Sequence, residues 1–318
     1  MKICFITPNS FFGKVPRDYK NCRTEYAWMI ALDANNIPIE NVLHSSVVQT
    51  YDLGIVILPK KLDHLPLSSL LSQAKKLCKK LAVMQEGPQW YFQDYKYVDQ
   101  INYINFVSEM DFLLVHNKSD ISYFKGIFKL PTYNLPSLMI EDTLKNIVAP
   151  SQKNGQPIIG GNFCSWYSGL DSYFVASNFK KPISVPSMGR RIQHEEHFPN
   201  LHHLPYMEWH DWMMALKEFS YGVHLMRTHA AGTFALNCAY WGIPCIGYKG
   251  LDTQETLHPH LTVNVGDIEM ANILSIKLRD TPEFYNFCCD DAKANYRRLY
   301  TETSWRLHWD SIYEKIKI

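Results

Sequence analysis

Residues 221–255 read YGVHLMRTHAAGTFALNCAYWGIPCIGYKGLDTQE and contain the alternation of elements that decides the fold. The apolar run 222–226 has the length of a buried strand, and residues 233–241 have helical spacing of apolar side chains. Gly242 ends that helix, and the apolar run 244–248 predicts a second buried strand. Strand, glycine-bearing turn, helix and strand make a βαβ unit. Its turn leaves backbone N–H groups at the positive end of a helix, where a phosphate is favoured.

The turn and helix of this stretch resemble the donor-binding half of GT-B glycosyltransferases, which use nucleotide sugars. Gly232 and Gly242-Ile243-Pro244 match the glycine and Gly-x-Pro spacing of that family. His229 stands where the family has a first glutamate, and Asn237 replaces the second, which grips the ribose hydroxyls. A neutral amide binds those hydroxyls more weakly than a carboxylate does. The resemblance implies an α/β fold with two Rossmann-like domains whose parallel sheets face across a cleft, and a C-terminal helix that crosses back to the first domain.

A length of 318 residues is enough for two domains of ordinary size. The polar segment 141–157, which contains proline and glycine, predicts the boundary between them. We expect an N-terminal acceptor-binding domain over 1–150, a nucleotide-sugar-binding domain over 151–300, and a returning helix over 301–318. Trp305 and Trp309, four residues apart, are expected to dock that helix.

The composition is that of an ordinary globular protein. A net charge of +1 argues against a globally basic nucleic-acid binder, although a local basic patch is compatible with it. The eight cysteines show no CxxC spacing and are read as reduced core residues, with disulfides as the alternative. The sequence contains no run of eighteen apolar residues, so no transmembrane helix is predicted. The N-terminal residues have the pattern of a strand rather than of a signal peptide. We therefore expect a cytoplasmic protein, in the host cytoplasm if a phage encodes it.

A basic loop is expected near the N-terminus. Residues 2–7 predict a buried strand and residues 25–34 a helix, with a long loop over 8–23 between them. Gly13, Lys14 and Arg17 lie in this loop together with other basic residues. The loop is either an ordinary solvated segment or a clamp on an anionic acceptor or on the donor phosphates.

Glu86 is the candidate catalytic base. It follows the strand predicted over 81–84, at the edge of a parallel sheet where ligands bind. The alternative is that its carboxylate caps the next helix. Trp90 begins an aromatic run that would serve as a platform for the acceptor. Before the strand, residues 67–81 predict an amphipathic helix whose wet face carries four lysines, Lys75, Lys76, Lys79 and Lys80.

The second domain supplies the predicted donor contacts. Its opening strand over 157–163 contains a glycine pair that allows close approach of a ligand. The diphosphate needs charge-assisted partners, for which guanidinium groups are well suited. The strand and turn over 201–206 are expected to face the nucleobase. The predicted donor-binding residues are Gly160, Gly161, Asn162, Arg190, Arg191, His203, Tyr206, Arg227, His229, Gly232, Thr233 and Asn237.

No metal site is predicted among the side chains, because the histidines lack the spacing of known zinc motifs. No tightly bound cofactor is expected. The co-substrate is a nucleoside diphosphate sugar, with a UDP-sugar as the expected donor, and a divalent cation bound with its diphosphate remains an option.

A weaker resemblance extends over much of the chain and concerns the bacteriophage DNA β-glucosyltransferases. It is carried by Lys14-Val15-Pro16, Thr24-Glu25, Tyr51-Asp52 and Gly160-Gly161-Asn162-Phe163. It implies that Glu86 deprotonates the hydroxymethyl group of a modified pyrimidine in DNA, and such a base implies inversion at the sugar.

Other functions remain open at this point. A hexosyl- or pentosyltransferase that acts on a glycan or on a lipid-linked sugar would have the same sequence pattern. The alternative that is not an enzyme is a non-catalytic nucleotide-sugar-binding protein. It stays open because both glutamates of the family are replaced in this sequence.

Overall fold

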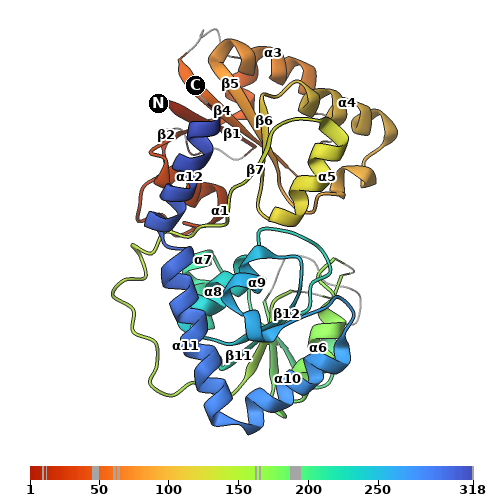
Figure 1. Cartoon of the computed structure of the whole chain (residues 1–318), viewed down its shortest axis with the longest axis vertical. Helices are drawn as coiled ribbons and strands as arrows, with labels where there is room; N and C mark the ends of the chain where they lie inside the picture. The colour runs from red at the N-terminus through yellow and green to blue at the C-terminus, as the bar shows by residue number, and fades with distance from the viewer. Residues whose placement is uncertain are drawn as a thin grey trace. The chain divides into compact units, whose positions relative to one another are not determined.

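The computed structural model describes residues 1–8, 11, 13–44, 50–59, 62, 65–161, 163–164, 166–186 and 195–316. The chain forms two compact units (Figure 1). Unit 1 combines Met1–Ile140 with Glu302–Ile318, and unit 2 is Glu141–Thr301. Each unit is an α/β layer structure built on one sheet, as the sequence predicts.

The sheet of unit 1 is parallel except for one short edge strand. Since buried parallel strands are apolar on both faces, the strand YDLGIVIL is almost continuously buried. In spatial order the described strands are β2 (Gly13–Lys14), β3 (Asn35–Pro38), β1 (Ile3–Thr7), β4 (Tyr51–Leu58), β5 (Cys78–Gln85), β6 (Phe112–Val115) and β7 (Thr132–Asn134). Strand β2 pairs antiparallel with β3, and lies within the segment for which the sequence predicts only a loop.

Helices cover the sheet of unit 1. The main apolar core lies between one face of the sheet and a group of four helices, α2 (Ile39–Leu43), α3 (Leu67–Leu77), α4 (Tyr97–Ser108) and α5 (Lys118–Phe128). Helices α1 (Thr24–Ala31) and α12 (Glu302–Ile316) lie side by side in the same unit (Figure 1).

The prediction for the lysine-rich helix is partly wrong. Helix α3 ends at Leu77, and β5 begins at Cys78, so Lys79 and Lys80 belong to a strand. The reason is that β5 pairs with β4 along its whole length, which outweighs the helical preference of lysine. Lys79 then forms an ion pair with Asp52 at 2.7 Å between Nζ and Oδ1. The Nζ of Lys80 donates to the backbone oxygen of Ile316, at the end of α12.

The last helix returns to the first unit, as the resemblance implies. The indole N–H groups of Trp28 and Trp305 both donate to the carbonyl oxygen of Pro136, at 3.0 Å and 2.8 Å. The rings of Trp305 and Trp309 stack with centroids 6.3 Å apart. The two tryptophans predicted to dock the helix therefore lie in its buried face.

The sheet of unit 2 is parallel throughout its described strands, and helices cover it. The strands in spatial order are β10 (Leu201–His203), β9 (Ile183–Val185), β8 (Pro157–Ile159), β11 (Tyr221–His224), β12 (Cys245–Tyr248) and β13 (Thr262–Val263). The helices are α6 (Gly169–Ser177), α7 (Trp209–Leu216), α8 (Thr233–Trp241), α9 (Asp252–Leu257), α10 (Ile268–Asp280) and α11 (Pro282–Leu299). The stretch that decides the fold therefore forms β11, α8 and β12, the central βαβ unit of this sheet.

Two glycines in central strands make room for cysteines. A Cβ on Gly54 would lie 2.6 Å from the Sγ of Cys78, and one on Gly222 would lie 3.0 Å from the Sγ of Cys238. The approach at Gly54 is too short for a Cβ unless Cys78 moves, and the one at Gly222 is tight. All eight cysteines are free thiols, six of them buried, while Cys164 and Cys289 are partly exposed.

Candidate functional site

The carboxyl ends of β8, β11 and β12 gather the predicted donor residues at one edge of the sheet of unit 2. Gly160 and Gly161 follow β8, and the N–H of Gly160 still donates to the oxygen of Val223 at 2.9 Å. A Cβ on Gly160 would lie 2.5 Å from the ring of His224, and one on Gly161 would lie 2.7 Å from Tyr167. Both glycines are therefore required by internal packing, in addition to any approach by a ligand.

Helix α8 begins at this edge. Its N-cap residue is Gly232, whose φ of +66° lies in the left-handed region, and no described side chain caps the first turn. The hydroxyl of Thr253 donates to the Gly232 oxygen at 2.9 Å, which fixes the turn. The first turn, starting at Thr233, contains no acidic residue that would offset the positive end of the helix dipole. These features leave an uncapped helix end that suits an anionic group.

Arg227 lies near this edge in a network with Asp171 and Tyr248. Its Nη2 and Nε approach the Oδ2 of Asp171 at 2.9 Å and 3.3 Å, and the Tyr248 hydroxyl donates to the same oxygen at 3.1 Å. Burial, and then the charge of Asp171, raises the pKa of Tyr248 to about 12. The Arg227 side chain is 55% exposed, so a bound diphosphate would share its guanidinium group with Asp171.

His229 and Asn237 occupy the positions of the two family glutamates. The ring of His229 packs on Gly250, where an added Cβ would lie 2.1 Å from Nε2. Asn237 is only 2% exposed, because most of α8 is buried on all sides, and its Oδ1 accepts a 3.5 Å contact from the indole N–H of Trp209. A contact between Asn237 and a ribose stays a prediction that would require the amide to leave this environment.

The residues predicted to face the nucleobase differ in exposure. The Nε2 of His203 lies 2.8 Å from the Oε1 of Glu195, which is fully buried. Tyr206 is 76% exposed, so its ring is accessible for stacking on a base. Asn162, Arg190 and Arg191 lie outside the described residues.

Glu86 lies at the corresponding edge of unit 1. It follows β5 directly, its side chain is exposed, and its N–H donates to the oxygen of Leu58 at 2.8 Å. A buried network holds the turn in which it lies. The Tyr103 hydroxyl donates to Oε1 of Gln85 at 2.5 Å, and Nε2 of Gln85 donates to the oxygen of Pro88 at 2.5 Å. The ring of Trp90 stacks with that of Tyr91, with centroids 6.2 Å apart.

Glu25 is a second carboxyl group in this region, and the sequence reasoning did not propose it. It lies in the first turn of α1, and burial raises its pKa, with a smaller contribution from the negative charge of Glu86. The two groups are thus close enough to interact electrostatically. The Thr24-Glu25 dipeptide was visible in the sequence, but only the fold brings it towards the end of β5.

His116 follows β6 at the same edge. Burial lowers its pKa to about 4, so the imidazole is neutral at pH 7. Its ring packs against Trp28 with centroids 4.9 Å apart, and the Nδ1 lies 3.5 Å from the Ser137 hydroxyl. The sequence showed a histidine at this strand end, but gave no reason to assign it a role.

Two basic side chains of the N-terminal loop are paired with carboxylates. The Nζ of Lys14 pairs with Asp33 at 2.5 Å, and Nη2 of Arg17 pairs with Glu302 of α12 at 2.5 Å. Gly13 has a φ of +101° and open space around it. Because exposed ion pairs contribute little free energy, an incoming phosphate could exchange with these carboxylates. The clamp therefore stays a prediction.

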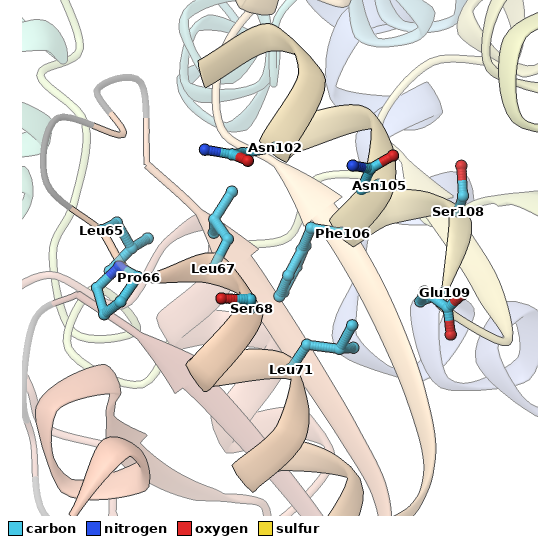
Figure 2. A pocket seen from close by; sticks show the side chains of 10 residues that line it. All are labelled: Leu65, Pro66, Leu67, Ser68, Leu71, Asn102, Asn105, Phe106, Ser108 and Glu109. Atoms are coloured by element: carbon cyan, nitrogen blue, oxygen red, sulfur yellow. The ribbon is translucent and has the colours of Figure 1, made fainter. Parts of the chain in front are cut away.

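A separate hollow of about 350 Å³ lies between α3 and α4 of unit 1 (Figure 2). Its floor contains Leu67, Leu71 and Phe106, while Asn102 and Asn105 project from α4 along its rim. It contains none of the predicted catalytic or binding residues.

In the parts of the chain with described coordinates, no three His, Cys, Asp or Glu side chains are grouped so that they could hold a metal ion. No helix in those parts is both long and apolar enough to span a membrane.

Comparison with solved structures decides the fold. The chain is similar to a sucrose-phosphate synthase from Thermosynechococcus elongatus, with a TM-score of 0.67, 11% identity, and 99% of each chain covered. It is similar to an α-glucosyltransferase in complex with UDP, with a TM-score of 0.66, 12% identity and 100% of both chains covered. The chain has the GT-B fold. No protein-family model and no curated protein matches its sequence.

One further similar GT-B structure is bound to nucleic acid. It is an α-glucosyltransferase in complex with UDP and a 13-mer DNA containing an HMU base, with a TM-score of 0.67, 12% identity and full coverage of both chains. The sequence resemblance concerned the β-glucosyltransferases, whereas these GT-B neighbours are α-glucosyltransferases. At such low identity the likeness establishes the fold of the chain and not its reaction.

Proposed function

We propose that this chain is a glycosyltransferase that moves a sugar from a nucleoside diphosphate sugar to an acceptor hydroxyl. The observation that carries the proposal is the start of α8. Its uncapped positive end lies at the carboxyl edge of a parallel sheet, in a fold whose similar structures include UDP complexes. We assign the diphosphate of a UDP-sugar to this helix end, near Gly232 and Thr233.

The surrounding donor contacts follow from the same assignment. Arg227 would bind the diphosphate while it remains fixed by Asp171. Gly160 and Gly161 would present backbone groups, and Tyr206 would stack on the base. Transfer then separates charge between the sugar and the leaving diphosphate, and the helix end and the guanidinium group stabilise that charge.

On the acceptor side we assign the role of base to Glu86. A carboxylate at the end of β5 can take the proton of an acceptor hydroxyl as its oxygen attacks the anomeric carbon. The exposed side chain of Glu86 permits contact with an acceptor. Burial raises the pKa of the neighbouring Glu25 carboxyl group, so Glu25 holds its proton to a higher pH than an exposed glutamate does.

For the acceptor we propose a hydroxymethylated pyrimidine in DNA. The similarity to an enzyme bound to DNA with an HMU base supports it, as does the basic loop with Lys14 and Arg17. The second candidate is a sugar acceptor, which the similarity to a sucrose-phosphate synthase favours. Affinity for DNA that falls steeply with salt would support the first candidate, because phosphate contacts release counterions.

The test is release of UDP from UDP-glucose, with hydroxymethylated DNA, unmodified DNA or free sugars as acceptors. We expect Glu86→Gln to lower turnover by about 100-fold or more while UDP binding is unchanged. Glu109→Gln, at an exposed carboxylate directly after the last residue of α4, is the matched control. Full turnover in Glu86→Gln would remove Glu86 from the mechanism.

The configuration of the product provides a second check on that role. The anomeric coupling constant measured by NMR distinguishes α- from β-linked product. A base that activates the acceptor for direct displacement implies inversion, so a β-product from an α-linked donor is expected if Glu86 acts in this way. An α-product would contradict this role for Glu86 and leave the transfer itself intact.

A further inference from the structure

Unit 2 contains two adjoining hollows at the end of α8 opposite to the proposed donor site. One has a volume of about 300 Å³ and the other about 400 Å³. Both are lined by Ala149, Trp241 and Lys293, so they adjoin across the Lys293 side chain. We call them the α8-end hollows. None of their residues belongs to the predicted donor or acceptor set.

The α8-end hollows lie on a rigid part of the unit. Helix α8 ends with Gly242 in the left-handed conformation, with 3.0 Å and 2.8 Å bonds from Gly242 and Ile243 N–H back to the helix. The Nζ of Lys153 donates to the oxygens of Trp241 and Gly242 at 3.1 Å and 2.9 Å. The alkyl chain of Lys293 lies across Gly242, where a Cβ would be 2.3 Å from its Cε. The wall is therefore formed before any ligand arrives.

Positive charge is concentrated at the α8-end hollows. Lys293 and Arg297 lie one turn apart on α11 and line the same hollow, and Arg297 is exposed. In the part of the chain that the structure describes, neither forms an ion pair. Like charges at this spacing repel each other, and Lys153 adds a third cation to the second hollow. An anion placed between them would relieve this repulsion.

Polar and aromatic groups accompany these cations. The Glu141 carboxylate lines the first hollow, and its Oε1 accepts a 2.7 Å hydrogen bond from the Tyr296 hydroxyl. Tyr240 lies beside it, with its ring at 4.7 Å from that of Trp241. Trp241 is 4% exposed, and its indole N–H has no acceptor among the described residues. Carboxylate, phenol and indole groups are suited to the hydroxyls and C–H faces of a sugar.

We propose that the α8-end hollows bind a small sugar phosphate. Lys293 and Arg297 hold the phosphate monoester, because two cations one turn apart match its charge of up to −2. Glu141 and Tyr240 contact the hydroxyls of the sugar. A volume of about 300 Å³ is within the range of small-molecule sites and accommodates one such ligand. The site is separate from the proposed donor site and does not depend on it.

The experiment is calorimetric titration of the full chain at low salt, with UDP present at saturating concentration. Ribose 5-phosphate, inorganic phosphate and ribose are the three probes. We expect ribose 5-phosphate to bind more tightly than inorganic phosphate, and ribose to give no measurable heat. Lys293→Met, which retains the packing on Gly242, and Arg297→Gln should each weaken binding by about tenfold. Arg298→Gln, the next residue on α11, is the charge-matched control and should bind as the wild type does.

Equal affinity in Arg297→Gln, Lys293→Met and the control would overturn the proposal. Binding of ribose 5-phosphate that appears only without UDP would place it in the donor site, and would overturn the proposal as well. If the chain did not bind UDP, the proposed function would be contradicted and the proposal for the α8-end hollows would not. The comparison of variants would still test these hollows. Arg297 is exposed, so its substitution leaves the fold intact.

Discussion

At the scale of single residues, the glycines at the donor edge are required by the packing of the protein itself, whether or not a ligand is bound. Gly232 combines a positive φ of +66° with a side chain packed on it, since a Cβ there would lie 2.1 Å from the Thr253 hydroxyl oxygen. Gly155 has a similar φ of +73° but open space around it. Substitutions at Gly232 and Gly155 therefore separate the effect of backbone strain from the effect of a steric clash.

We expect Gly232→Ala to destabilise the protein by more than Gly155→Ala. Gly155→Ala introduces only the left-handed strain, about 1–2 kcal/mol. Gly232→Ala adds the clash with Thr253 and displaces the first turn of α8, so UDP affinity should fall in this variant alone. Urea unfolding and UDP titration measure the two effects. Equal losses of stability in the two variants would show that the contact with Thr253 relaxes at no cost.

Two buried histidines make the stability of unit 2 sensitive to acid. His224 and His258 are 6% and 2% exposed, and burial lowers the pKa of each to about 4 from 6.5. Between these pH values the unfolded chain binds more protons, so stability is complete above pH 6.5 and is lost as the pH falls to 4. Each histidine accounts for roughly 3 kcal/mol of that loss.

Unfolding by urea at pH 7 and at pH 4.5 measures this dependence. His224→Phe should show a shallower loss of stability on acidification than the wild type, because the variant has one buried group fewer to protonate. His260→Gln, at an exposed position, is the control. An unchanged slope in His224→Phe would contradict the assignment.

At the scale of elements, β5 and α4 together determine where Glu86 lies. Tyr103 of α4 is fully buried and bonded to Gln85, the last residue of β5. Gln85 in turn holds Pro88 in the turn that follows Glu86. The turn that contains Glu86 is thus held in part by a residue of the following helix, through Gln85.

Tyr103→Phe tests this positioning. The variant leaves the Oε1 of Gln85 buried without a donor, which costs about 1–3 kcal/mol of stability. If Glu86 is the base, turnover should also fall while the KM for the donor is unchanged. Tyr97→Phe on the same helix, 78% exposed, is the control. Loss of stability with unaltered turnover would limit Tyr103 to a structural role.

The elements show where sequence reasoning succeeds. Helix Thr233–Trp241 has the predicted bounds, because a glycine lies directly before its first residue and directly after its last. Strand Tyr51–Leu58 also has a clear local signal, since it is apolar and buried from Leu53 to Leu58. Local signals decide both elements, so no knowledge of the tertiary structure is needed.

Prediction from the sequence fails for elements and contacts that depend on residues far away along the chain. Lys79 and Lys80 become strand residues through pairing of β5 with β4, and the short strand β7 exists only because β6 lies beside it. Glu25 approaches Glu86 from a helix about sixty residues away in the sequence, a proximity that no local pattern predicts. The buried surroundings of Asn237 likewise depend on the helices packed around α8.

At the scale of the whole molecule, unit 1 is assembled from both ends of the chain. Helix α12 supplies Trp305 and Trp309 to its core, and Arg17 and Lys80 bind the two ends of the helix. Unit 2 uses one continuous segment, Glu141–Thr301. Removal of α12 should therefore affect the two units differently.

A chain that ends at Thr301 should lose stability in unit 1 and retain it in unit 2. Loss of α12 exposes Trp28 and removes one of two donors from the Pro136 carbonyl, so the calorimetric transition of unit 1 should move to lower temperature. The transition of unit 2 should not move. A chain that ends at Ile316 keeps the helix and serves as the control. Equal shifts of both transitions would mean that the units do not unfold independently.

The return of the last helix also has a consequence for biosynthesis. A ribosome makes α12 only after all of unit 2 has been synthesised, so the nascent chain holds an incomplete unit 1 until α12 has emerged. The surface of Trp28 stays uncovered during that interval, and early termination leaves it uncovered permanently. A chain that includes α12 is thus the first species in which the proposed acceptor side has its native support.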